Sequence, residues 1–178
     1  MSVVFRSTDA FMARVRADLS RPHPFAYERV GFITIRAASS NGGLLLLAQE
    51  YFPVADNEYV RDSSVGAMLG QEAFRKALEI ALLSRVGVLH VHQHELGKRL
   101  WFSTIDLREQ LRFVPDFFKV CPHMPHGALV LSPYSAAGRV WLGPSEIRRI
   151  TEFNSIGAQV RVWPSAKDGS TGFAHDWS

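Results

Sequence analysis

The sequence has one cysteine, Cys121, and no long apolar run. A single cysteine excludes an internal disulfide and suits a reducing compartment. No stretch approaches the roughly 18 uncharged apolar residues that indicate a membrane-spanning helix, and the first residues lack the apolar core of a signal peptide. We therefore expect a soluble, cytoplasmic protein without a membrane partner.

A concentrated positive charge is also missing. The formal net charge of +3 comes from scattered arginines, so we expect a solvated basic face and no nucleic-acid partner. The 178 residues, 47% of them hydrophobic, suffice for one domain with a substantial core and hardly for two. We expect this domain to span residues 1–163, followed by a flexible polar tail at 164–178.

Local patterns predict three helices among several strands. The expected helices cover residues 10–19, 65–84 and 103 to about 111, with caps at Ser63 or Ser64 for the second and at Ser103 for the third. The expected strands cover residues 27–36, 44–54, 86–94, 126–132, 138–142 and 157–163, whereas 144–153 fits either a helix or an edge strand. This order predicts a mixed α/β (α+β) fold with a curved, largely antiparallel sheet.

Three of the seven histidines stand close together, at His90, His92 and His94. Alternate side chains of a strand share a face, so these imidazoles are expected to point the same way. Two neutral imidazoles at this spacing can bind one borderline-soft cation, and a carboxylate from the next element can complete the set. Asp106, three residues after Ser103, is the candidate carboxylate.

Glu28 is the second carboxylate of interest. It stands at the start of an otherwise apolar predicted strand, where a charge is costly to bury unless it is paired or needed. An ordinary charged residue at the edge of a strand is the plain alternative. The predicted topology places this strand opposite the histidine strand, so Glu28 could face a bound metal.

These residues together resemble the JAMM signature of the JAB/MPN metalloprotease family. The resemblance rests on Glu28-x-x-Gly31 on the first strand, a long helix, His-x-His on a strand, and Ser103-x-x-Asp106 at a helix start, in that order over residues 25–163. It implies an MPN/JAB-like curved sheet flanked by helices, as in a compact prokaryotic-type member. It also implies a zinc-dependent peptidase or isopeptidase that removes ubiquitin or ubiquitin-like proteins, or trims their precursors.

The spacing departs from the family pattern. The family serine usually follows the second ligand histidine by eight residues, and a proline directly follows that histidine. Here Glu95 replaces the proline, and Ser103 lies nine residues beyond His94. The pair His92 and His94 therefore needs a one-residue insertion, whereas the pair of His90 and His92 needs three. We favour His92 and His94, with His90 as an alternative ligand or a neighbour of the ligands.

The resemblance assigns roles to the matching residues. His92, His94 and Asp106 would bind one catalytic zinc ion, Glu28 would act as general base, and Ser103 would donate a hydrogen bond to the developing oxyanion. The substrate would be the extended tail of a ubiquitin-like protein, with conjugation-pathway enzymes as further partners. Antiviral defence is among the roles of bacterial systems of this kind.

Two other classes remain open from the sequence. One is an inactive MPN scaffold that binds partners without a metal, although every expected ligand type is present here. The other is a cupin-like metal-binding barrel, to which the predicted helix before the histidine strand is poorly suited. A separate metal cluster at Cys121, His123 and His126 is a weaker candidate.

Overall fold

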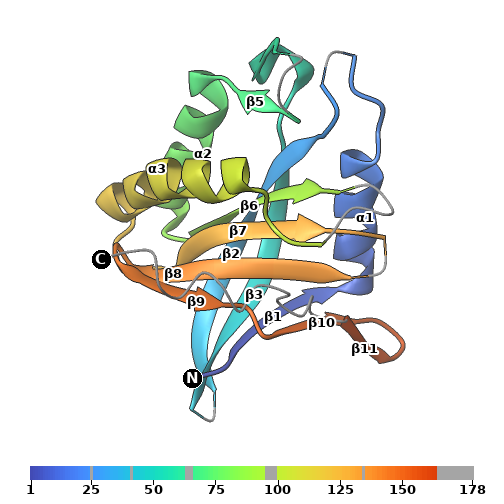
Figure 1. Ribbon diagram of the computed structural model, residues 1–178. Coiled ribbons are helices and arrows are strands. Elements are labelled where there is room, and N and C mark those ends of the chain that lie inside the picture. The colour runs from blue at the N-terminus through green and yellow to red at the C-terminus, as the bar shows by residue number, and fades with distance from the viewer. Residues whose placement is uncertain (25, 41, 63–65, 95–99, 134, 164–178) are drawn as a thin grey trace.

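The computed structural model describes residues 1–24, 26–40, 42–62, 66–94, 100–133 and 135–163. A curled sheet runs through the middle of the molecule and has helices on both faces (Figure 1). Helix α1 (Asp9–Leu19) packs on one face, and α2 (Gln71–Ser84) and α3 (Thr104–Val120) pack on the other. The mixed α/β fold predicted from the sequence is confirmed, and it differs from the all-β barrel of a cupin.

The sheet has nine strands in the order β11-β10-β1-β3-β2-β6-β7-β8-β9. Their bounds are β1 Val3–Thr8, β2 Val30–Ser40, β3 Gly43–Pro53, β6 Gly87–Gln93, β7 His126–Leu131, β8 Ala136–Gly143, β9 Glu146–Arg149, β10 Glu152–Ile156 and β11 Val160–Trp163. Three pairings, β1 with β3, β1 with β10 and β6 with β7, are parallel, and the others are antiparallel. The histidine strand β6 therefore lies inside the sheet, between β2 and β7.

Strand β6 divides its side chains between two cores. Leu89 and Val91 pack into the core on the α1 face, whereas Val88 packs into the core beneath α2 and α3. His90 and His92 have the parity of Val88 and so lie on the α2 and α3 face. Because helices cover both faces at this point, the histidines are placed within packed protein.

The predicted helix at 10–19 and the hairpin of β2 and β3 are confirmed. Ser103 caps α3 as predicted, accepting a hydrogen bond from the Asp106 N–H. The helix runs to Val120 rather than Leu111, and it contains Pro115. An interior proline costs a helix about 3 kcal/mol, but burial of Val114, Phe117 and Phe118 on the sheet outweighs this cost.

Several sequence predictions were wrong. The helix predicted from residue 65 begins at Gln71, because Met68 and Leu69 instead form β5 (Met68–Leu69), which pairs with β4 (Tyr59–Val60) after the short 3-10 helix Asp56–Glu58. The proposed caps Ser63 and Ser64, and the tail at 164–178, lie outside the described residues. Strand β1 was not predicted. Of the two alternatives for residues 144–153, the edge strand is confirmed: β9 lies at the edge of the sheet, and β10 begins in the same stretch. Within the described part of the chain, no helix is both long and apolar enough to cross a lipid bilayer.

The start of β2 also differs from the prediction. The strand begins at Val30, so Glu28 precedes the sheet instead of lying in it. The next residue of the motif, Gly31, has a packing role, because a Cβ there would lie 2.3 Å from the Tyr51 ring. Tyr51 in turn donates a hydrogen bond of 2.6 Å to Asp18 at the end of α1. The glycine thus lets α1, β2 and β3 pack closely next to Glu28.

Candidate metal centre

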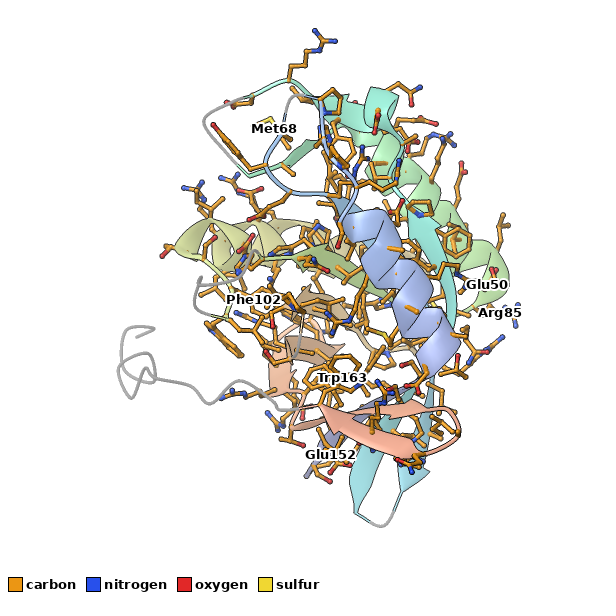
Figure 2. All side chains as sticks on the ribbon, turned by 90° about the vertical axis from the view of Figure 1, so that its right-hand side faces the viewer. Glu50, Met68, Arg85, Phe102, Glu152 and Trp163 are labelled. Carbon is orange, nitrogen blue, oxygen red and sulfur yellow. The ribbon has the colours of Figure 1, made fainter. Side chains whose placement is uncertain are left out.

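Three separate segments meet at the end of β6. Val30 is the register partner of His92, so the residues just before β2 lie beside this end of the histidine strand. These residues carry Glu28, and the first turn of α3 carries Asp106. Phe102, just before α3, has its ring centroid 6.3 Å from that of His92. In Figure 2 the labelled Phe102 lies below α3 and Met68 lies above it.

His92 and His94 converge on one point. Both side chains are buried, and their Nε2 atoms lie 3.2 Å apart. A tetrahedral zinc ion with Zn–N bonds of about 2.0–2.1 Å holds two nitrogens about 3.3–3.4 Å apart. The Nε2 pair therefore already has the separation that two ligands of such an ion require.

Burial also keeps the His92 imidazole in the form that binds metals. Desolvation, opposed by Asp106 and aided by His94, lowers the pKa of His92 to about 4. At neutral pH its ring is therefore uncharged, with a lone pair available for a cation. Within the part of the chain that the structure describes, the buried Nδ1 atoms of His92 and His94 have no hydrogen-bond partner, whereas the two Nε2 atoms face each other.

His90 has a different environment from the other two histidines. Its ring packs against Phe32, at a centroid distance of 5.8 Å, and against Phe113, at 5.2 Å. Desolvation and the neighbouring His92 lower the pKa of His90 to about 3. The structure therefore places His90 in an aromatic pocket next to the His92 ring.

Two carboxylates approach the histidine pair. Glu28 Oε1 lies 3.9 Å from His94 Nε2, and Asp106 Oδ2 lies 3.7 Å from His92 Nε2. Among the described residues, one group of three or more His, Cys, Asp or Glu side chains has all its ligand atoms within 4.8 Å of one another, and it consists of Glu28, His92 and His94. This group could hold a metal ion, and Asp106 lies at its border.

Ser103 and Asp106 hold each other in place. The Ser103 hydroxyl donates a hydrogen bond of 2.7 Å to Asp106 Oδ2, and the Ser103 N–H donates another of 2.7 Å to the same oxygen. Burial alone would raise the pKa of Asp106, but His92 and the two hydrogen bonds outweigh it and hold the pKa below its ordinary value. The carboxylate is therefore charged and fixed at the start of α3.

The second cluster suggested by the sequence consists of Cys121, His123 and His126, and in it His126 has a structural role. His126 accepts a hydrogen bond from the Val88 N–H at 3.1 Å and donates one to the Cys121 carbonyl at 2.9 Å. Both ring nitrogens are thus used by the backbone. His126 packs between Phe117 and Phe118, so this ring supports the core beneath α3.

One residue of the site was missed in the sequence. Gly66 lies against the Glu28 carboxylate, but its position within a predicted helix hid this contact. The five residues predicted for catalysis and metal binding, Glu28, His92, His94, Ser103 and Asp106, are brought together, and the His90 ring lies next to the His92 ring, with its centroid 5.7 Å away. Comparison with models of known protein families and with curated proteins gives no significant match for this chain.

Proposed function

We propose that this protein is a zinc-dependent peptidase or isopeptidase of the JAMM type, which cleaves after the C-terminal tail of a ubiquitin-like protein. The convergence of Glu28, His92, His94 and Asp106 at the end of β6 carries the proposal. Glu28 lies far from the other three residues in the sequence, and the fold brings its carboxylate close to the histidine pair, as does the start of α3 for Asp106. The donor set of two imidazole nitrogens and a carboxylate also suits zinc.

In this proposal His92, His94 and Asp106 hold the ion, and Glu28 moves a proton. When bound, zinc would supply a Lewis acid that lowers the pKa of a water molecule to about 7. The Glu28 carboxylate would accept the proton of that water and pass it to the leaving amine. The resemblance assigns Glu28 the role of base and Asp106 that of ligand, and the two carboxylates lie at similar distances from the histidine pair, 3.9 Å from His94 Nε2 and 3.7 Å from His92 Nε2.

Ser103 would serve in two ways. Its hydroxyl holds Asp106 in the orientation of a ligand, as the hydrogen bonds described above indicate. To donate to the carbonyl oxygen of the scissile bond, the hydroxyl would have to turn away from Asp106. Ser103 is exposed and can therefore be reached by a substrate.

The surroundings suit an extended peptide. Tyr27, next to Glu28 in the sequence, is 72% exposed, and Ile105, next to Asp106, is 48% exposed, so both side chains are accessible to a bound peptide. The short strand β5 pairs with β4, and an extended tail could add to such a strand through backbone hydrogen bonds.

The test compares zinc content and cleavage of a ubiquitin C-terminal fusion in the wild type and in four variants. Glu28→Gln should retain zinc and lose turnover by about 10²–10⁴-fold, because the amide cannot accept the proton. His92→Ala, His94→Ala and Asp106→Ala should each lose zinc. Full activity in Glu28→Gln, or loss of its zinc, would contradict the assignment of Glu28 as the base.

A further inference from the structure

Gly66 holds the backbone that carries Glu28. The Gly66 carbonyl accepts hydrogen bonds from two consecutive amides, the Tyr27 N–H at 2.9 Å and the Glu28 N–H at 3.0 Å. Glu28 precedes β2 and therefore lacks the support of the sheet at its own position. The two bonds supply this support from a segment that is nearly forty residues away in the sequence.

Gly66 also leaves room for the Glu28 carboxylate. A Cβ at residue 66 would lie 2.8 Å from Glu28 Oε2 and 3.0 Å from Glu28 Cδ, both shorter than ordinary contacts. At Gly87 and Gly127 the same atom would meet backbone oxygens at 2.2 Å, and the fold itself would resist. At Gly66 the obstacle is the far end of a flexible side chain, so a Cβ would displace the carboxylate and leave the fold largely unchanged.

The segment after Gly66 is itself anchored to the body of the protein. Met68 and Leu69 pair with β4, and Gly70, which precedes α2, donates a hydrogen bond of 2.8 Å from its N–H to the Glu58 carbonyl. The Glu58 side chain is buried and accepts hydrogen bonds from Lys76 and from the Ala55 N–H. Gly66 thus has a fixed position against which Glu28 is placed.

We propose that Gly66 is a positioning residue for Glu28, which sets both the backbone and the carboxylate of the general base. The catalytic consequence rests on the proposed function, whereas the placement of the carboxylate does not. A misplacement of about 1 Å can cost about 100-fold in rate. Gly66→Ala should therefore lower kcat by about 10- to 100-fold, with KM and zinc content within about threefold of the wild type.

The experiment compares Gly66→Ala with Gly143→Ala, a matched control in which a Cβ has nothing within 4 Å. The first measurement is the ¹³C resonance of the Glu28 carboxyl in metal-free protein, identified by its loss in Glu28→Gln. This resonance should move in Gly66→Ala and stay in place in Gly143→Ala. An unmoved resonance in Gly66→Ala would overturn the proposal, whatever the activity.

The second measurement is turnover in a double-variant cycle. If Gly66 acts through Glu28, adding Gly66→Ala to Glu28→Gln should cost no more than about twofold, although the same change costs 10-fold or more in the wild type. Equal losses in both backgrounds would show that Gly66 acts elsewhere. A moved resonance in a protein whose wild type binds zinc and cleaves no tail would uphold the placement of Glu28 and refute the peptidase.

Discussion

Three histidines on one face of a strand have two different environments in this protein. His92 and His94 direct their Nε2 atoms toward each other, whereas His90 is enclosed by the rings of Phe32 and Phe113. Strand parity alone gives all three the same direction. The difference comes from neighbouring elements: aromatic side chains of β2 and α3 occupy the space around His90, and two carboxylates lie near the other pair.

His90→Leu tests this division of roles at the scale of one residue. Leucine has a similar volume and removes the buried Nδ1, which has no hydrogen-bond partner among the described residues. We expect zinc affinity within about threefold of the wild type and a free energy of unfolding that is unchanged or higher by up to about 1–2 kcal/mol. Zinc titration and urea denaturation measure the two quantities.

The matched change is His92→Leu. Residues that merely support a metal ligand are worth about 10–100-fold in affinity, so removal of a ligand should cost more than about 100-fold. Loss of zinc in His90→Leu with retention in His92→Leu would reverse the assignment of the ligand pair.

At the scale of elements, the connection from α1 to β2 positions Glu28, and Arg29 secures this connection. The Arg29 side chain is 3% exposed and donates hydrogen bonds to the Arg21 carbonyl at 3.0 Å, the Pro22 carbonyl at 2.7 Å and Asp56 at 2.7 Å. The bond from Arg29 also lowers the pKa of Asp56. The planar guanidinium group of Arg29 therefore links the connection from α1 to β2 with the segment that carries Asp56.

Arg29→Lys should destabilise the protein by about 2–3 kcal/mol, because an ammonium group cannot reach three acceptors from one buried position. The control is Arg36→Lys, since exposed Arg36 makes longer hydrogen bonds, of 3.3 and 3.4 Å, to the carbonyls of Arg85 and Ser84. That change should cost less than about 0.5 kcal/mol. If Arg29→Lys and Arg36→Lys had the same denaturation midpoint, Arg29 would not be the residue that stabilises this connection.

Elements with strong local signals were predicted from the sequence. The apolar spacing of α1, the turn between β2 and β3, and the Ser103 cap are each contained within a few neighbouring residues. Strand β1 depends on parallel pairing with β3 and β10, and β10 lies nearly 150 residues away. Pairing at such separation leaves no local pattern, which explains why this strand was missed.

The same reasoning applies to the candidate site. His92, His94, Ser103 and Asp106 lie close together in the sequence, and a spacing argument can find them. Gly66 could not be found in this way, because its contact with Glu28 depends on a segment that the apolar spacing assigned to a helix. The strand pairing of Met68 and Leu69 overrides that local preference.

At the scale of the whole molecule, the fold keeps several histidines uncharged within the protein. His90, His92 and His126 are enclosed between the sheet and its helices, and burial lowers the pKa of each well below that of an exposed histidine. The metal-free protein must therefore lose stability in acid, because these histidines bind protons in the unfolded chain at pH values at which they stay unprotonated in the folded state.

His126 allows this effect to be measured apart from the metal centre. Burial lowers its pKa from 6.5 to about 4. Because the folded pKa is the lower one, the contribution of His126 is fully present above pH 6.5 and is lost as the pH falls from 6.5 toward 4. From pH 7 to pH 5 this loss amounts to about 2 kcal/mol.

The variant His126→Asn tests this contribution. Its amide oxygen can still accept a hydrogen bond from the Val88 N–H but does not titrate. Urea denaturation of the metal-free variant should therefore show a free energy of unfolding that falls by about 2 kcal/mol less between pH 7 and pH 5 than in the wild type. An unchanged difference between pH 7 and pH 5 would mean that His126 accepts a proton without leaving the folded core.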